Sequence, residues 1–331
     1  MAKKKGGKSF NILLIGQRGR LQYEALLFAA SLRRFDPDFA GRLIVLEPVG
    51  GKWGKDARMT DAPRAALEAL GAEILPFEAH HFGPDYPQGN KIEALLAAPE
   101  GEPFLFVDSD TVVTGPLSHL PFDFDHPAAS MRRENTWPKL ELYGPDYAEI
   151  WGALYDKFGL DLAKSLDESQ PVNYWERFLY FNAGWFFGPD PVAFGTRFLE
   201  IALAIRDDRP EALVCQEIYP WLDQIALPLV VQSFGGGRPG PELDGLDGDV
   251  TCHWRILPLA YAREADATID ALEEAAAPNK IKKVLKEYEP MRRMIYQGRG
   301  RKVRALFDRD NLPSRERAIR NKIKREGFWM R

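Results

Sequence analysis

The aspartate pair in Asp108-Ser109-Asp110 is the sequence feature best suited to do chemistry. It follows the apolar run Phe104–Val107, which is typical of a strand buried on both faces. Two carboxylates at i and i+2 where a strand ends can face the carboxyl edge of a parallel sheet, where open α/β folds bind ligands. Their oxygens suit Mg²⁺ or Mn²⁺, which commonly bridge to substrate phosphates. A solvated turn is the alternative, but two carboxylates beside a buried strand are costly without a cation.

Strands and helices alternate in the sequence around this pair. The pattern predicts strands over 11–16, 42–47, 72–77 and 103–113, separated by helices over 23–34, 62–70 and 90–98. Such an order is typical of an α/β fold with a mostly parallel, doubly wound sheet flanked by helices.

The rest of the chain is less regular. We expect helices over 147–158 and 193–205, a strand over 180–187, and a short helix running into a strand over 221–231. Residues 234–249 are rich in glycine and predict a loop. Residues 279–331 predict two or three basic amphipathic helices broken at Pro290, Gly298–Gly300 and Pro313.

Composition excludes several classes of protein. The chain has 331 residues, of which 45% are hydrophobic and 28% charged, which excludes wholesale disorder. Two cysteines cannot make a disulfide framework or a cysteine zinc site, and neither a signal sequence nor a membrane span is predicted, so we expect a cytoplasmic protein. Net charge is −4, but residues 279–331 carry 18 Lys/Arg against 6 Asp/Glu. Any polyanion contact should therefore lie in this tail, and a nucleic-acid partner is not expected.

Several motifs together resemble a known family. Asn90–Leu95 followed by PFLFVDSDTVVTGPLSHL (103–120) looks like the core of the GT-A nucleotide-sugar glycosyltransferases, especially glycosyltransferase family 8, the glycogenin and lipopolysaccharide galactosyltransferase group. The first predicted strand and helix are similar to that family's as well. Further along the chain, the family's "FNxG" segment, "DQ" pair and metal-binding histidine are matched by 180–184, Leu222-Asp223-Gln224 and Cys252-His253-Trp254.

The resemblance implies a metal site. Asp108 and Asp110 would bind a divalent cation, and His253 would complete the site. An imidazole beside carboxylates favours Mn²⁺ over Mg²⁺. Without the resemblance, His253 would be read as a hydrogen-bonded strand residue.

The resemblance also implies roles for residues around the donor. Asn182, Asp223 and Gln224 would line the sugar and the reaction centre, although Asp223 could equally be a charge at the start of a helix. The implied donor-binding set is Ile15, Gly16, Tyr23, Lys91, Asp108, Ser109, Asp110, Ala183, Gly184 and Arg255. In this set Tyr23 would contact the base or pack its helix, Lys91 would contact the diphosphate or the sugar, and Arg255 would replace the family's phosphate-binding lysine.

These roles imply a metal-dependent transfer of a sugar from a nucleotide-sugar donor, UDP-linked in the family, to a carbohydrate or glycolipid acceptor, with retention of anomeric configuration. Attack by the acceptor on the leaving-group face and a covalent route through Asp223 both remain open. The alternatives are a haloacid-dehalogenase-type phosphatase using Asp108 and Asp110, and a binding protein without turnover.

The domains that we predict are a basic N-terminal tail (1–10), a GT-A domain (11–265) with an acceptor-side insertion (114–179), and a basic helical extension (266–331). Trp137 and Trp175 in or near the insertion are the aromatics best placed for surface contact, whereas Trp151 and Tyr155 have the spacing of a helix core. The extension would present its cations to an anionic acceptor or membrane surface, or clamp onto the acidic body; these cations are Lys282, Lys283, Arg292, Arg293, Arg301, Lys302 and Arg304.

Overall fold

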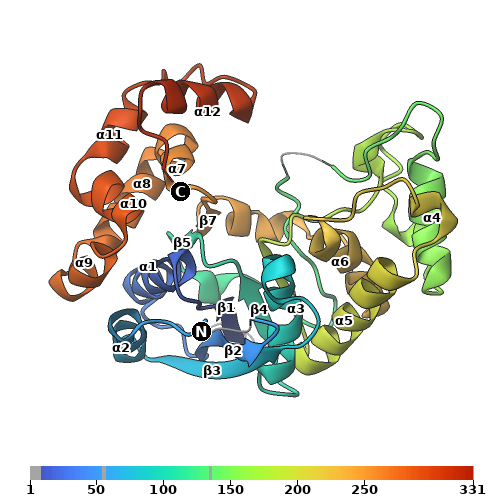
Figure 1. The fold of residues 1–331 in the computed structure, drawn as a ribbon, viewed down its shortest axis with the longest axis horizontal. Helices are drawn as coiled ribbons and strands as arrows, with labels where there is room; N and C mark the ends of the chain where they lie inside the picture. Colours follow the sequence, from blue (N-terminus) through green and yellow to red (C-terminus); the bar gives the residue numbers. More distant parts are fainter. Residues whose placement is uncertain (1–8, 54–56, 134–135, 331) are drawn as a thin grey trace, which may run out of the picture.

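The computed structural model describes residues 9–53, 57–133 and 136–330. Its larger sheet has the strand order β3-β2-β1-β4-β6, in which only β6 runs antiparallel to its neighbour (Figure 1). A smaller antiparallel sheet joins β5 to β7. The strands are β1 (Asn11–Ile15), β2 (Leu43–Gly51), β3 (Ala72–Ala79), β4 (Phe104–Val107), β5 (Thr111–Val113), β6 (Trp185–Gly188) and β7 (Thr251–His253). The α/β class with a mostly parallel sheet is therefore confirmed.

Helices flank the sheet (Figure 1). They are α1 (Arg20–Phe35), α2 (Asp61–Ala69), α3 (Asn90–Glu93), α4 (Tyr147–Lys157), α5 (Pro191–Asp207), α6 (Leu222–Ser233), α7 (Leu257–Arg263), α8 (Asp266–Ala276), α9 (Asn279–Leu285), α10 (Glu289–Met291), α11 (Arg299–Arg304) and α12 (Glu316–Arg325). Over the described ranges, none of these helices combines the length and the apolar character needed to cross a bilayer.

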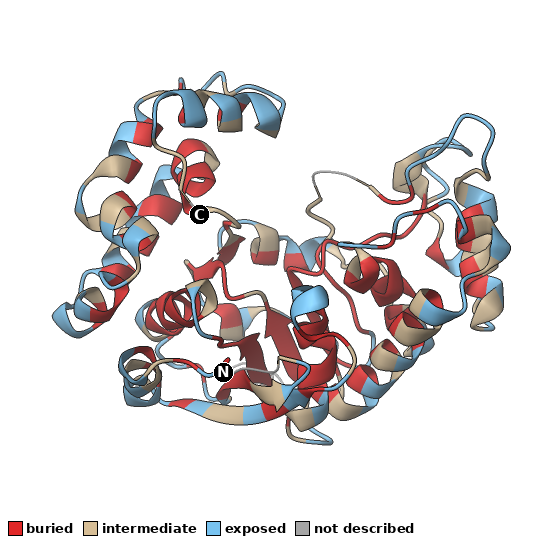
Figure 2. Cartoon of the chain, viewed as in Figure 1, coloured by how far each residue is buried: buried red, intermediate tan, exposed pale blue. Residues whose placement is uncertain are grey.

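The sheet separates two hydrophobic cores, one on each face. Successive side chains of β1 point to opposite faces of the sheet, so they pack alternately into the two cores. Ile12 and Leu14 pack with α1 and the C-terminal helices, whereas Leu13 and Ile15 pack with α5, α6 and the aromatic side chains of the middle of the chain. The central strands β1 and β4 are buried between these layers (Figure 2), whereas the edge strand β3 is partly exposed. The two central strands can therefore hold polar side chains only at their ends.

The structure corrects three predicted strands. The segment 103–113 divides into β4 and β5, which belong to different sheets, because the chain turns at Asp108–Asp110. The strand predicted over 180–187 is reduced to β6, since Ala183 adopts a positive φ of 61° that interrupts extended backbone. The strand predicted within 221–231 was wrong: α6 continues to Ser233 and is buried nearly all round, so its sequence lacks the polar face that marks a helix.

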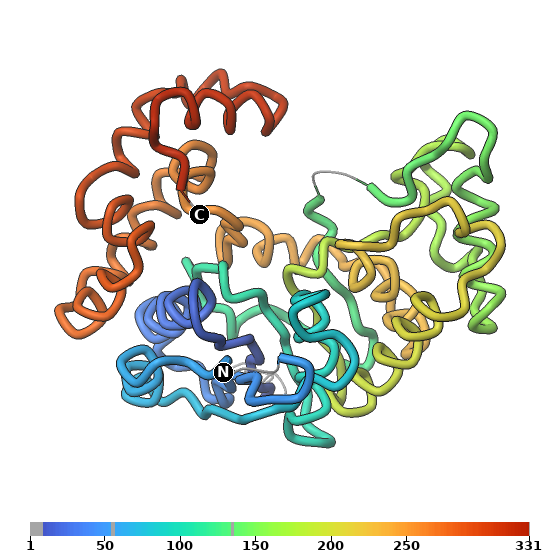
Figure 3. Tube along the Cα trace, in the orientation of Figure 1, coloured from blue at the N-terminus to red at the C-terminus, as the bar shows by residue number. Residues whose placement is uncertain are grey.

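The basic C-terminal segment packs onto the sheet's helices. Helix α9 contacts α1 and α2, and α8 contacts α1, whereas α11 and α12 pack on α7 at the far end of the segment (Figure 3). Ile281, Val284 and Leu285 are buried in the same core as β1, so the apolar face predicted for this segment faces the body.

Many of the predicted cations of this segment are already paired. Arg301 Nη2 lies 2.7 Å from carboxylate oxygens of both Asp270 and Glu273. Arg304 is buried and pairs with Asp266, so it was wrongly predicted to face a membrane or acceptor. The intramolecular clamp, which the sequence left open, is present for these two arginines.

Candidate active site

A cavity of about 320 Å³ lies at the carboxyl ends of β1 and β4, where the sequence predicted ligand binding. This first cavity is lined by Ile15, Arg20, Leu21, Pro87, Gln88, Asn90, Lys91, Phe106, Asp108, Ser109 and Asp110. A second cavity of about 270 Å³ adjoins it, because Gln88, Lys91 and Asp108 line both. The second cavity is completed by Arg133, Thr136, Tyr180, Asn182, Pro220, Trp221, Asp223, Gln224, His253 and Arg255.

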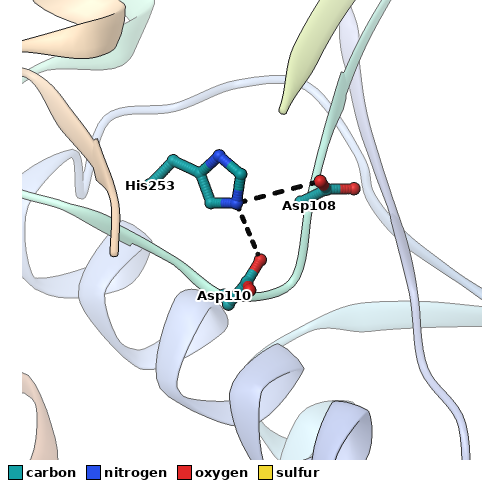
Figure 4. Close-up of side chains that lie close together, drawn as sticks. All are labelled: Asp108, Asp110 and His253. Atoms are coloured by element: carbon teal, nitrogen blue, oxygen red, sulfur yellow. Dashed lines mark ion pairs between the residues drawn. The ribbon is translucent and has the colours of Figure 1, made fainter. Parts of the chain in front are cut away.

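Two strands bring Asp108, Asp110 and His253 together (Figure 4). The aspartates occupy the turn between β4 and β5, and the pairing of β5 with β7 sets Thr111 opposite His253. His253 Nε2 lies 3.1 Å from Asp110 Oδ1 and 3.8 Å from Asp108 Oδ2. One ligand atom from each of the three residues lies within 4.8 Å of the others.

The residues of this cluster suit a divalent cation. Two carboxylates and one imidazole form a donor set of hard oxygens and one nitrogen, which suits Mn²⁺ better than an all-oxygen set does. Gly184 makes room for the imidazole, because a Cβ at that position would lie 2.3 Å from His253 Nδ1. The chain thus brings the predicted ligands together and leaves space for the imidazole ring of His253.

Lys91 connects the cluster with the second cavity. Its Nζ lies 2.8 Å from Asp108 Oδ1 and 3.4 Å from Asp223 Oδ2, and it donates a 3.0 Å hydrogen bond to the Ala183 carbonyl. Lys91 is 8% exposed and therefore is not a surface lysine, which was the alternative to the predicted role in the site. Its attraction to Asp108 and Asp223 outweighs its burial and raises the pKa of its ammonium.

Asp223 is held by two partners. Tyr86 donates a 2.7 Å hydrogen bond to Asp223 Oδ1 and accepts one of 2.8 Å from the Asp223 N–H, while Lys91 pairs with Oδ2. Asp223 is in the first turn of α6, as the alternative reading of this residue expected, and it also lines the second cavity. Next to it, Gln224 accepts a 2.8 Å hydrogen bond from Tyr180.

Three neighbouring carboxylates, Asp108 and Asp110 in the first cavity and Glu24 beside it, differ in their pKa. Burial raises the pKa of Asp108 despite the attraction of Lys91 and His253. Burial would do the same for Asp110, but attraction and a hydrogen bond from His253, with help from Arg20, lower its pKa to about 2. Burial and the charge of Asp110 raise the pKa of Glu24 to about 8. This excess of crowded carboxylates favours binding of a cation.

Arg20 and Glu24 are site residues that the sequence analysis missed. Arg20 Nη1 lies 3.2 Å from Glu24 Oε1 and 3.5 Å from Asp110 Oδ2, and Glu24 accepts a 3.1 Å hydrogen bond from the Ser109 hydroxyl. The available signal was their i,i+4 spacing at the start of a helix that follows the first strand.

Some predicted donor contacts lie elsewhere. Tyr23 is 9% exposed and its ring stacks on Tyr288, 5.4 Å between centres, so it packs its helix against the C-terminal segment and does not line the first cavity. Gly16 does not line the first cavity either. Because this glycine has no side chain, Val45 and Met59 can pack closely against the backbone at the end of β1.

The remaining predicted residues surround the second cavity. Asn182 lines it and donates a hydrogen bond from its amide to the Arg132 carbonyl. Arg255 lines it with a positive φ of 59°. The Ala183 carbonyl accepts a hydrogen bond from Lys91, and the Gly184 carbonyl accepts one from the Asp108 N–H. The missing side chain of Gly184 leaves room for His253.

The aromatic residues were predicted with mixed success. Trp151 and Tyr155 are buried, as their helical spacing predicted. Trp137 was wrongly predicted to make surface contact: it is 3% exposed, packs edge-on against Trp151, and donates a hydrogen bond to the Glu217 carbonyl. Trp175 is partly exposed and carries the Arg133 guanidinium over its ring.

Comparison with known proteins places the chain in a family. The family described as the Rhodobacterales glycosyltransferase domain matches residues 12–235. Similar solved structures include a galactosyltransferase, LgtC, in complex with donor and acceptor sugar analogs (16% identity, 83% of this chain and 99% of that chain covered, TM-score 0.47). Another is the glycosyltransferase GlyE of Streptococcus pneumoniae TIGR4 (12% identity, 85% and 63% covered, TM-score 0.43). No curated protein is significantly similar in sequence. Because the family match spans more than half of the chain, the protein belongs to the Rhodobacterales glycosyltransferase domain family and is a glycosyltransferase.

Proposed function

We propose that this glycosyltransferase transfers a hexosyl group from a UDP-sugar to a carbohydrate or glycolipid acceptor, with a divalent cation, Mn²⁺ or Mg²⁺, bound by Asp108, Asp110 and His253. The observation that carries the proposal is the position of these three side chains where the two adjoining cavities meet. When bound, the cation would neutralise charge on the departing diphosphate. The first cavity would bind the nucleotide sugar and the second the acceptor.

The chain's own residues would orient the reactants. Lys91, between Asp108 and Asp223, is placed to fix both carboxylates and to contact the donor where the cavities meet. Arg20, beside Asp110, would add positive charge at the first cavity. Asn182 and Gln224 line the second cavity, where they can donate or accept hydrogen bonds with sugar hydroxyls.

Retention is the stereochemical outcome that we propose. The acceptor hydroxyl would attack the anomeric carbon from the face of the leaving group, the bond to the diphosphate oxygen would break, and the hydroxyl proton would pass to that diphosphate. Tyr86 and Lys91 already occupy both oxygens of Asp223, which favours this route over a covalent intermediate on that carboxylate. Asp223 would then position Lys91 and the acceptor.

The proposed organisation is a catalytic domain of 11–265 that acts in the cytoplasm, with 266–331 as an extension. Burial of α9 against α1 supports a structural role for the extension. The membrane surface predicted as its partner has no support in the structure. The phosphatase alternative is not favoured, because the family is one of glycosyltransferases and the aspartates follow the fourth strand along the chain.

Thermal unfolding with nucleotides tests the proposal. UDP with MnCl₂ should raise the unfolding temperature of the wild type by several degrees, because a ligand that binds only the folded state stabilises it. Asp110→Asn should lose most of this shift, whereas the matched change Asp208→Asn on an exposed residue should keep it. A shift with beryllofluoride and none with UDP and Mn²⁺ would instead support the phosphatase.

A further inference from the structure

Arg133 is a cation in the second cavity that the proposed transfer does not use. Its Nη1 donates a 3.2 Å hydrogen bond to the Tyr180 carbonyl, and its guanidinium carbon lies 4.4 Å from the centre of the Trp175 ring. The side chain is half-buried and lines the cavity together with Asn182 and Gln224. One face of the guanidinium is thus fixed by an aromatic ring, as in a preorganised binding site.

Among the described residues that line the cavity, no carboxylate is left to pair with Arg133. The two aspartates that line the same cavity, Asp108 and Asp223, both pair with Lys91. Among the described residues, no carboxylate lies within ion-pair distance of Arg133. Burial lowers the pKa of this guanidinium to about 10; the charge of Glu176 opposes the shift and that of Arg238 adds to it.

A planar guanidinium has the geometry to bind a carboxylate or a phosphate through two parallel hydrogen bonds. Burying such a group without a counter-charge is costly, and an anionic ligand would offset the cost. We propose that the acceptor saccharide carries an anionic substituent, a carboxylate or a phosphate, that binds Arg133 beside Trp175. Arg133 is then a residue that determines acceptor specificity. This inference rests on the proposed function, because it assigns the second cavity to the acceptor.

The donor diphosphate is the other anion that Arg133 could bind. Asp108 lines both cavities, whereas Arg20, Ser109 and Asp110 line only the first and Arg133 lines only the second. The diphosphate of a donor in the first cavity would bind the cation where the cavities meet, so the placement of Arg133 in the second cavity favours the acceptor. The two assignments give different results in the experiment below.

Ligand-observed NMR titration of the full chain, saturated with UDP and the diamagnetic cation Mg²⁺, tests the inference. The probes are methyl β-glucuronide, glucose 6-phosphate and the neutral methyl β-glucoside. At least one acidic probe should bind about tenfold more tightly than the neutral one, since hydrogen bonds to charged groups are the stronger ones. The acidic probe with the higher affinity identifies the anionic group as carboxylate or phosphate.

Three variants link that preference to Arg133. Arg133→Gln should abolish it, and Arg133→Lys should keep a reduced preference, which separates loss of charge from loss of packing. Arg209→Gln is the matched control, because Arg209 is exposed, bonds the Gln216 carbonyl and lines neither cavity.

Equal binding of acidic and neutral probes by the wild type, no binding of either acidic probe, or an acidic preference that survives Arg133→Gln would overturn the inference. Loss of UDP affinity in Arg133→Gln would assign Arg133 to the donor and overturn it as well. Failure of the wild type to bind UDP at all would instead contradict the proposed function.

Discussion

Lys91 balances the charge of the site, because one ammonium pairs with two carboxylates from different elements. Asp108 follows β4 and Asp223 is in α6, and both lie within 3.4 Å of Lys91 Nζ. The lysine itself is 8% exposed, so its desolvation is offset mainly by these two contacts and by its hydrogen bond to the Ala183 carbonyl. Removing it would leave two carboxylates near each other without their shared cation.

Lys91→Met should therefore lower the free energy of unfolding by about 3 kcal/mol or more, because an uncompensated buried charge remains. Lys157→Met is the matched control: Lys157 Nζ lies 2.6 Å from the Asp208 carboxylate, whose side chain is 85% exposed, and loss of such a pair costs about 1 kcal/mol or less. Urea unfolding measures both. Equal, small losses in the two variants would show that Lys91 does not have this role.

The sequence could predict some site residues but not others. Asp108 and Asp110 are recognisable from an apolar strand that ends in two carboxylates, and His253 from its place in the order of family motifs. Glu24 was missed because a helical pattern does not show which glutamate is buried. In the structure Glu24 is 1% exposed and accepts a hydrogen bond from Ser109. Tyr23 was left between contact with the base and packing of its helix, because the sequence could not show that Tyr288 covers it.

At the scale of elements, the site depends on where strands end. The turn after β4 projects Asp108 and Asp110, and β7 returns from far along the chain to place His253 opposite Thr111. The Gly184 carbonyl accepts a 2.8 Å hydrogen bond from the Asp108 N–H just before β6. The strand predicted over 180–187 was too long, because aromatic residues with high strand propensity precede a residue with positive φ, and the strand begins only after it.

Gly184→Ala should weaken Mn²⁺ binding by about tenfold or more, because a Cβ would lie 2.3 Å from His253 Nδ1 and displace the ring from the aspartates. Gly237→Ala is the matched control, since a Cβ there meets nothing within 4 Å. Calorimetric titration of Mn²⁺ in the presence of UDP measures both affinities. Unchanged affinity in Gly184→Ala would contradict the assignment of His253 as a ligand.

At the scale of the whole molecule, the C-terminal helices belong to the same core as the sheet. Ile281, Val284 and Leu285 are buried with residues of β1 and α1, and Arg304 donates hydrogen bonds to the Tyr261 and Glu264 carbonyls. The sequence correctly predicted helices with an apolar face in this segment, but Pro290 and Gly300, which were predicted to break them, lie inside α10 and α11. The sequence could not show whether this apolar face packs on the rest of the protein or on a membrane, because both surfaces favour the same amphipathic pattern.

The chain is proposed to cleave a nucleotide sugar with a cation bound by Asp108 and Asp110. The most direct measurement is release of UDP from a panel of UDP-sugars, with and without Mn²⁺, by the wild type and the variants Asp108→Ala and Asp110→Ala. The wild type should release UDP from at least one donor only when the metal is present, and each variant should be slower by at least about a hundredfold. Release that persists in both variants, or that needs no metal, would contradict the account.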